Sequence, residues 1–131
     1  MPKILIASGP VIVENNKVLL NKHGDTAFWK FCGGRVEDYE TDLIENAKRE
    51  VKEEMGVDIK ILNQEPFIAF TRKETTDGKV DIILVHFLAE RIGEVKPGGD
   101  IREWNWFDIN NLSDDLGPNI IPALKYFGFI K

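Results

Sequence analysis

Three glutamates, Glu50, Glu53 and Glu54, follow Arg49 at a spacing that could bring their carboxylates together in a reactive or metal-binding site. In a helix their i, i+3 and i+4 positions lie on one side. Carboxylates this close repel one another, and a divalent cation such as Mg²⁺ relieves the repulsion, because it takes oxygen ligands and shares its remaining sites with phosphates. Arg49 can orient a carboxylate through a forked hydrogen bond. Taken alone, such a segment is more often a solvated helix face.

The segment before these acids favours the chemical interpretation. Gly33 and Gly34 allow the backbone to pass close to a ligand or an ion, and a carbonyl there could complete a metal shell. Glu37, Asp38 and Glu40 add carboxylates in the loop that leads to the predicted helix. Together the glycines and the acids favour a site for a divalent cation.

Composition limits the partners. The chain has 131 residues, with 22 acidic and 17 basic side chains, a formal net charge of −5 and a pI of about 5.1. Because phosphate affinity comes from clustered Lys and Arg, and no such cluster is present, binding to nucleic acid duplexes is not expected. A phosphorylated substrate would then need carboxylate-bound metal to supply positive charge.

Length and cysteine content indicate the setting. We expect one domain over residues 1–131. No apolar run approaches the roughly 20 residues that span a bilayer, and the N-terminal segment does not fit a signal peptide, so neither a membrane nor export is expected. The single cysteine, Cys32, excludes an internal disulfide and is expected to be a packing residue rather than a nucleophile. The expected location is the reducing cytoplasm.

A helix over residues 42–55 must position the glutamates. Asp42 and Glu45 form a D-x-x-E capping pattern, and Gly56 suits the position just after the helix end. Apolar residues recur at helical spacing on the side away from the acids, namely Ile44, Ala47, Val51 and Met55. One element therefore carries both the acids and a core-facing stripe.

Strands are predicted on both sides of this helix, and a second helix at the end. Asn15-Asn16 is a turn signal that predicts a β-hairpin, preceded by an apolar run with a Gly9-Pro10 break. We expect strands at about residues 3–14, 18–20, 27–32, 66–73, 79–89 and 102–108, and a helix from about Asn119 to Gly128. This order predicts an α+β fold with a mixed β-sheet sandwiched between α-helices.

A resemblance follows from the longest motif. The run GGRVEDYETDLIENAKREVKEEMGV resembles the Nudix box, G-x5-E-x7-R-E-U-x-E-E-x-G-U, where U is a large aliphatic residue. Gly34 and Glu40 match its first part. The second part is matched without a gap by Arg49, Glu50, Val51, Glu53, Glu54, Gly56 and Val57. The residues from Trp29 to Gly34 resemble the family's W-x-F-P-G-G segment. The strand order before and after the box also fits the fold of Nudix (MutT-like) hydrolases, so the resemblance covers nearly the whole chain.

The chain also departs from the box. Eight residues separate Glu40 from Arg49 where the pattern has seven, while Tyr39 stands at a usual Gly and Cys32 at a usual Pro. The extra residue bears on the role of Glu40 more than on the helix glutamates. We predict a longer loop around residues 39–42 and a regular helix from about residue 43, with a π-bulge inside the helix as the alternative.

The resemblance implies a Mg²⁺-dependent pyrophosphohydrolase, with Mn²⁺ as an alternative cation. It implies metal ligation by Glu53 and Glu54, and a role for Glu50 as a further ligand or the general base. The Gly34 carbonyl would be another ligand, and Arg49 would hold the carboxylates in place. The substrate would be a nucleoside diphosphate derivative, cleaved at its diphosphate linkage by water.

The class of nucleotide stays open among NTPs, ADP-ribose, nucleotide sugars and dinucleoside polyphosphates. Pro66 lies only ten residues after Gly56, nearer than the proline expected of ADP-ribose hydrolases. The alternative function is a non-catalytic Nudix-fold nucleotide-binding or regulatory domain, and a weaker third is an isomerase of isoprenoid diphosphates. The complete set of box glutamates favours hydrolysis. A homodimer is left open.

Residues outside the helix are candidates for substrate contact. Strand aromatics more often belong to the core, loop acids more often to the plain surface, and exposed arginines as often to salt bridges. The candidates are Arg35, Trp29, Phe28, Arg72, Asp100 and Glu103.

Overall fold

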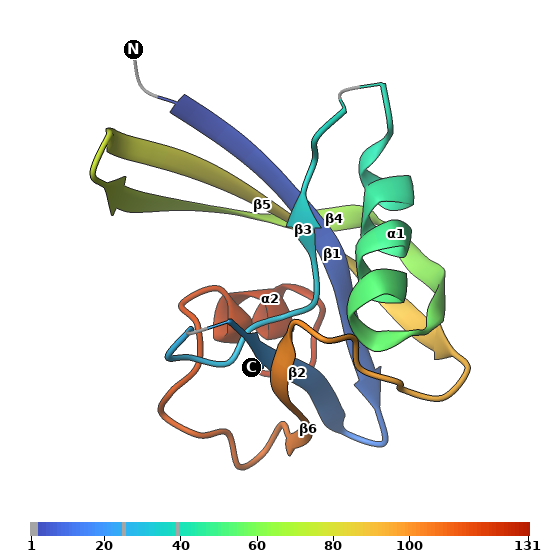
Figure 1. Ribbon diagram of the computed structural model, residues 1–131. Coiled ribbons are helices and arrows are strands. Elements are labelled where there is room, and N and C mark those ends of the chain that lie inside the picture. Colours follow the sequence, from blue (N-terminus) through green and yellow to red (C-terminus); the bar gives the residue numbers. More distant parts are fainter. Residues whose placement is uncertain (1–2, 25, 39) are drawn as a thin grey trace.

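The computed structural model describes residues 3–24, 26–38 and 40–131. Its elements, in chain order, are β1 (Lys3–Glu14), β2 (Lys17–His23), β3 (Gly34–Arg35), α1 (Leu43–Met55), β4 (Asp58–Thr75), β5 (Gly78–Ile92), β6 (Ile101–Asp108) and α2 (Ile120–Tyr126). The strands form a sheet of order β4-β5-β1-β2-β6, and β3 pairs with β1 (Figure 1). Strands β1 and β5 run parallel and the other neighbours antiparallel, so the sheet is mixed, as predicted.

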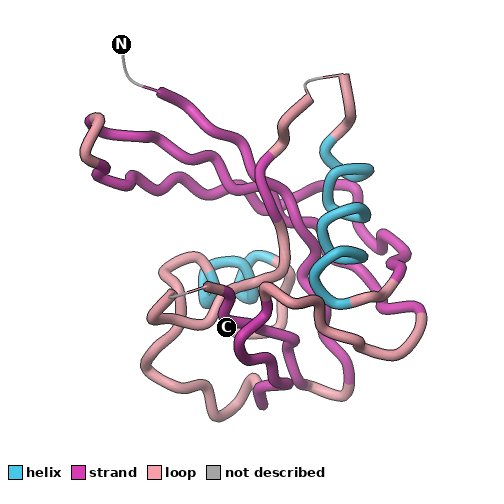
Figure 2. The backbone as a smooth tube through the Cα atoms, in the orientation of Figure 1, coloured by secondary structure: helices cyan, strands magenta, loops and turns pink. Residues whose placement is uncertain are grey.

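The two helices cover opposite faces of the sheet (Figure 2). Successive residues of a strand point to opposite faces. Accordingly, Val11 packs in the cluster that contains the α2 side chains Ala123 and Leu124. Its neighbour Ile12 packs in the cluster that contains Val51 of α1. The predicted α+β fold, with a mixed sheet between helices, is confirmed.

Helix α1 begins and ends where its capping residues predict. The Asp42 side chain accepts a hydrogen bond from the Glu45 amide (2.8 Å), and Gly56 adopts a left-handed conformation with φ of 71° while its amide donates to the Lys52 carbonyl. The helix is regular from Leu43 onward, so the extra residue of the box is absorbed before the helix, as predicted, and not in a π-bulge. Tyr39, part of that loop, lies outside the described residues.

The first hairpin is confirmed, but the break predicted in its first strand is not. Asn15 and Asn16 both have positive φ (50° and 63°), which gives the two-residue turn the twist that hairpins prefer. Strand β1 runs unbroken through Gly9 and Pro10, because its parallel ladder with β5 continues from Lys3 to Ile12. Only its other edge changes partner, from β3 to β2.

The strand predicted over residues 27–32 is wrong. Only Trp29 and Lys30 form isolated bridges there, with Leu116 and Asn21, and the short strand β3 comes later. The reason is that Trp29 and Phe31 turn into the α2-side core, which holds the segment as an irregular link across the sheet. Strand β4 also begins earlier than predicted, at Asp58, because two register shifts accommodate the polar stretch before Pro66.

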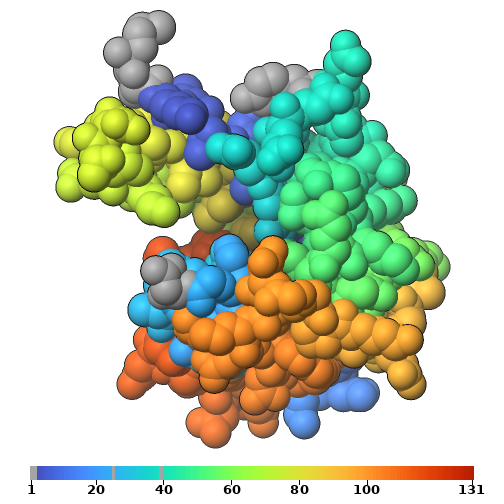
Figure 3. Space-filling model, in the orientation of Figure 1, coloured from blue at the N-terminus to red at the C-terminus, as the bar shows by residue number. Residues whose placement is uncertain are grey.

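Three strand segments extend beyond the helices as a ribbon, formed by residues 3–5 of β1, 68–75 of β4 and 78–83 of β5 (Figures 1 and 3). Several of its apolar side chains face solvent: Ile4 is 54%, Ile68 54% and Phe70 77% exposed. No helix among the described residues has the length and apolar character to cross a membrane.

A hydrogen bond between His86 of β5 and Asn119, at the start of α2, predicts a pH effect on stability. His86 is buried, and burial lowers its pKa to about 4. Nδ2 of Asn119 donates to Nε2 of His86 (2.8 Å), which requires that nitrogen to be unprotonated. Since the folded pKa lies below the unfolded one, stability is fully present above about pH 6.5 and is lost as pH falls toward 4, by up to about 3 kcal/mol.

Urea unfolding between pH 8 and 5 measures this loss. His86→Gln keeps a hydrogen-bonding side chain that does not titrate, so its free energy of unfolding should fall less steeply below pH 6.5. His23→Gln is the comparison variant: burial lowers the pKa of this histidine too, but it is less buried than His86, so its replacement should change the slope less. Parallel curves for wild type and His86→Gln would contradict the prediction.

Candidate active site

The glycine pair and helix α1 meet through backbone-to-carboxylate contacts. The Gly33 amide donates a hydrogen bond to the Glu54 carboxylate (2.8 Å). Gly34 lies so close to the Glu50 carboxylate that a β-carbon at this position would overlap it. The two predicted ligands Glu50 and Glu54 are thus both brought to the Gly33–Gly34 backbone.

This contact depends on a second close approach, beneath the glycine pair. Gly9 of β1 lies against the Cys32–Gly33 backbone, and a β-carbon on Gly9 would overlap the Cys32 carbonyl. Gly33 has φ of 152°, and a β-carbon there would lie 2.8 Å from the Ser8 carbonyl. Because glycine alone leaves this space free, the chain can pass between β1 and α1.

The glutamates are held in surroundings that disfavour their charge. Burial raises the pKa of Glu54 to about 7, and the nearby charges of Glu50 and Glu53 act in the same direction. Burial likewise raises the pKa of Glu50. Glu53 and Glu54 also lie in the last turn of α1, where the negative end of the helix dipole opposes carboxylates. Such a group of acids favours a nearby positive charge.

Lys30 supplies part of that charge, and sequence reasoning missed it. Its side chain is largely buried; burial lowers its pKa, and the charge of Glu54 opposes that effect. Its Nζ lies 3.3 Å from Nε2 of His23. The available signal was a lysine between the aromatic residues of Trp29-Lys30-Phe31, just before the glycine pair.

Arg49 contacts the carboxylates that it was predicted to orient. Its guanidinium lies 3.0 Å from the Glu50 carboxylate and 3.2 Å from that of Glu53. The Glu50 side chain is only 16% exposed, whereas that of Glu53 is 59% exposed and turns along the helix surface. The structure therefore brings Glu50 and Glu54 to the glycine pair, and leaves Glu53 paired with Arg49.

A divalent cation fits this donor set. Carboxylates and a backbone carbonyl are the hard oxygen ligands that Mg²⁺ takes. Glu50 and Glu54 lie at the Gly33–Gly34 backbone, and Glu53 would have to exchange its ion pair with Arg49 for the cation. Within residues 3–24, 26–38 and 40–131, no three acidic, His or Cys side chains are already gathered in a ligating arrangement.

Cys32 has the packing role that was predicted. It is buried, and burial raises the pKa of its thiol well above the ordinary range, so little thiolate forms. Nδ2 of Asn21 donates to its sulfur (3.4 Å). Glu40 is exposed, and its amide donates to the Asp38 side chain within the loop.

Of the candidates for substrate contact near the glycine pair, Trp29 is held in the core. Its ring makes an edge contact with Phe107 (4.7 Å between centroids) and lies under the Lys22 ammonium. Phe28 is 43% exposed and remains open to stacking. Arg35 is exposed on β3, beside Glu37 at 3.9 Å.

The other three candidates lie elsewhere. Arg72, on the ribbon, makes a forked hydrogen bond to Asp81 across the β4–β5 pair. Glu103 of β6 pairs with Lys22 at 3.8 Å. Asp100 is exposed in the turn before β6, where its charge raises the pKa of His23 against the effect of burial.

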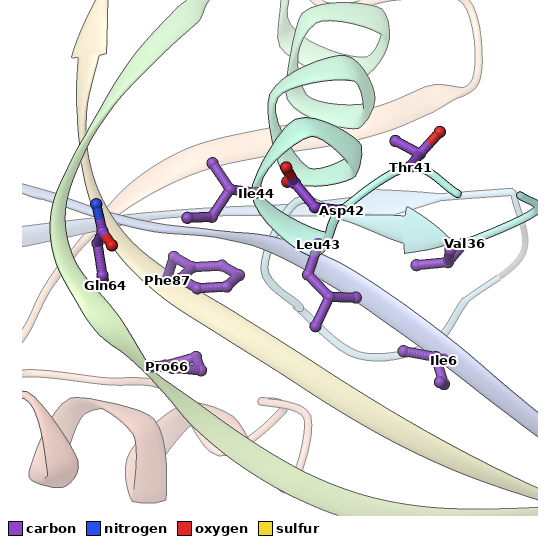
Figure 4. A pocket seen from close by; sticks show the side chains of 9 residues that line it. All are labelled: Ile6, Val36, Thr41, Asp42, Leu43, Ile44, Gln64, Pro66 and Phe87. Carbon is purple, nitrogen blue, oxygen red and sulfur yellow. The ribbon is translucent and has the colours of Figure 1, made fainter. Parts of the chain in front are cut away.

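One pocket in the described part of the structure lies away from the glutamates. It has a volume of about 550 Å³ and lies between the start of α1 and the sheet (Figure 4). Its lining is mainly apolar and comprises Ile6, Val36, Thr41, Asp42, Leu43, Ile44, Gln64, Pro66 and Phe87. Asp42, its only carboxylate, is already used as the helix cap. The pocket therefore offers shape but no cation-binding group.

Comparison with known proteins identifies the family of the chain. The sequence model of the NUDIX domain matches residues 5–127, and the chain belongs to the Nudix family. A curated relative from Methanocaldococcus jannaschii, described as an ADP-ribose pyrophosphatase, is 35% identical over 112 residues. That match covers 82% of this chain but only 63% of the relative, so the chain spans less than two thirds of its length.

Solved structures share the fold. A MutT NUDIX hydrolase from Burkholderia pseudomallei superposes with a TM-score of 0.75 at 21% identity, covering 94% of this chain and 97% of that one. An ADP-ribose pyrophosphatase from Streptococcus suis gives a TM-score of 0.66 at 21% identity, covering 92% and 87%. The resemblance to the family found in the sequence, and the fold it implied, are confirmed.

The close approach at Gly9 generates a stability prediction. Gly9→Ala places a methyl group against the Cys32–Gly33 backbone, which cannot move without displacing Gly34. We expect a loss of about 1–3 kcal/mol in the free energy of unfolding, the usual cost of overpacking. Gly99→Ala is the matched control, because a β-carbon at Gly99 meets nothing within 4 Å. Equal urea midpoints for the two variants would count against this packing.

Proposed function

We propose that this chain is a Mg²⁺-dependent Nudix pyrophosphohydrolase, active with Mn²⁺ as an alternative cation, that cleaves the diphosphate linkage of a nucleoside diphosphate derivative in the cytoplasm. One observation carries the proposal. Glu50 and Glu54 are turned inward onto the Gly33–Gly34 backbone, although burial raises the pKa of both. Carboxylates kept at a cost in stability are typical of functional sites.

In this proposal each site residue has a defined role. Glu53, Glu54, Glu50 and the Gly34 carbonyl would hold the cation, and Arg49 holds the Glu50 and Glu53 carboxylates in place before the cation binds. When bound, Mg²⁺ supplies positive charge to the diphosphate and activates water. Glu50 is the proposed general base if it is not itself a ligand. Because phosphoryl transfer needs mainly positioning and charge, a rigid helix carrying these acids suffices.

ADP-ribose is the first substrate to test. The description of the Methanocaldococcus jannaschii relative supports it, at 35% identity. The position of Pro66, only ten residues after Gly56, argues against it. Phe28, an exposed aromatic side chain beside Gly117, is the candidate for stacking on a base. NTPs, nucleotide sugars and dinucleoside polyphosphates complete the panel.

The experiment is turnover of this panel with Mg²⁺, Mn²⁺ or EDTA, with products separated by ion-exchange chromatography. We expect metal-dependent cleavage to two phosphorylated products. Glu53→Gln and Glu54→Gln should each lower turnover of the best substrate about a thousandfold, corresponding to ~4 kcal/mol of barrier. Glu50→Gln should also lower it strongly.

A matched control comes from the same helix. Glu45 is an exposed glutamate in the first turn of α1 whose side chain pairs with Lys48 and not with the glycine pair, so Glu45→Gln should keep wild-type activity. Circular dichroism checks that every variant is folded. The catalytic assignment would be wrong if the Glu50, Glu53 and Glu54 variants all fold and all retain at least half of the wild-type activity. The alternative function, a non-catalytic binding domain, would then be favoured.

A homodimer is a separate proposal, supported by the exposed apolar side chains of the ribbon. Ile4 and Phe70 line the same hollow beside Ile83, and all three would gain from being covered. Sedimentation velocity over a range of concentrations should show dimers that Phe70→Lys disrupts. Ile121→Lys, at an exposed apolar residue of α2, is the control. A wild type that stays monomeric at all concentrations would exclude this interface.

A further inference from the structure

Asn46 is a buried polar residue on the core side of α1, and its contacts are unusual for that position. It is 1% exposed and neighbours Ala47 in the buried stripe. Its Nδ2 donates to the Ser8 hydroxyl oxygen (2.9 Å) and to the Gly34 carbonyl (3.0 Å). Its Oδ1 accepts from the Arg49 guanidinium (2.8 Å). One amide therefore joins β1, the glycine pair and the arginine that holds the glutamates.

The contact with Gly34 fixes a specific atom. The Asn46 amide donates to the Gly34 carbonyl, and Gly34 is also paired with Ser8 in the β1–β3 ladder. The donated hydrogen bond adds a side-chain restraint from α1 to a peptide that the β1–β3 ladder already holds on its other side. Ser8 holds the amide from the other side, because its hydroxyl donates to the Leu43 carbonyl and so accepts from Asn46.

The contact with Arg49 fixes a second group. The guanidinium contacts Asn46 together with Glu50 and Glu53. Arg49 is partly exposed, so its carboxylate contacts alone would leave it mobile. A buried amide acceptor gives it one fixed point, from which the two carboxylates are aligned.

Helix stability does not explain this residue. Asparagine is a poor helix former, and a buried amide costs free energy unless it is fully hydrogen-bonded. An apolar side chain would suit both the helix and the surrounding stripe. The amide is instead used at both its nitrogen and its oxygen, toward two groups assigned to the cation site.

We propose that Asn46 is a positioning residue for the divalent cation, acting through the Gly34 carbonyl and the Arg49 guanidinium. This inference rests on the proposed function, because it concerns the same site. Partners that orient metal ligands typically change metal affinity by 10- to 100-fold. Asn46 touches neither substrate nor cation, so its loss weakens cation binding without removing a ligand.

Calorimetric titration of the metal-free protein with Mg²⁺ tests the proposal without turnover. Asn46→Ala should raise the Kd for Mg²⁺ at least 10-fold, and raise by a similar factor the Mg²⁺ concentration needed for half-maximal hydrolysis. The KM for substrate at saturating Mg²⁺ should change much less. Asn46→Leu fills the space, suits a helix and removes the same contacts, so it should give the same result if the alanine variant folds poorly.

Ser8→Ala is the matched control. It removes the other partner of the Asn46 amide and the contact with Leu43, but leaves the Gly34 and Arg49 contacts in place. It should lower the Tm in EDTA about as much as Asn46→Ala while keeping the wild-type Kd for Mg²⁺. Affinity that falls equally in the Ser8 and Asn46 variants would indicate a merely structural role and overturn the inference.

The two proposals fail in distinguishable ways. Wild-type protein that neither binds Mg²⁺ nor hydrolyses the panel would overturn the proposed function and this inference with it. Wild-type protein that does both, with folded Asn46 variants of unchanged Kd, would overturn the inference alone.

Discussion

Strand β1 and the glycine pair Gly33–Gly34 are in direct backbone contact, and the candidate active site depends on that contact. With no side chain on Gly9, the Cys32–Gly33 peptide can settle against β1. The Gly33 amide then points to the Glu54 carboxylate, and the Gly34 carbonyl meets the Asn46 amide. A side chain at Gly9 would displace the turn and separate these groups.

The position of α1 is fixed at both ends. Near its start, the Ser8 hydroxyl donates to the Leu43 carbonyl. At its end, the loop before β6 supplies the amides of Lys96 and Gly98 to the carbonyls of Met55 and Glu54. A helix end has carbonyls without partners, and here neighbouring backbone satisfies two of them. The acids of the last turn are therefore held on a rigid element.

That rigidity has an electrostatic cost. Glu54 is largely removed from water beside Glu50 and Glu53, and its pKa rises to about 7. Lys30 offsets part of the negative charge, and Arg49 contacts two of the glutamates. The arrangement is stable enough to fold, but it would gain from a further cation. In the proposed function, this cluster of carboxylates is the place where the acidic chain would bind the cation that contacts the diphosphate.

The sequence by itself determined much of this protein. The D-x-x-E cap, the apolar stripe and Gly56 set the bounds of α1, since they act within one or two helical turns. The box spacing made Glu50, Glu53, Glu54 and Arg49 the candidate site residues, because residues three and four apart in a helix are neighbours whatever surrounds them. The Asn15-Asn16 turn was equally local.

Only the tertiary structure decided which acids turn inward and what holds them. Glu50 and Glu54 meet the glycine pair while Glu53 does not, and that difference depends on where the Gly33–Gly34 turn crosses α1. Lys30 and Asn46 were missed because their partners lie elsewhere in the chain. The predicted strand at 27–32 failed for the same reason, since core packing overrode its local β-propensity. Local patterns fix an element and its faces; contacts between distant segments fix what each face meets.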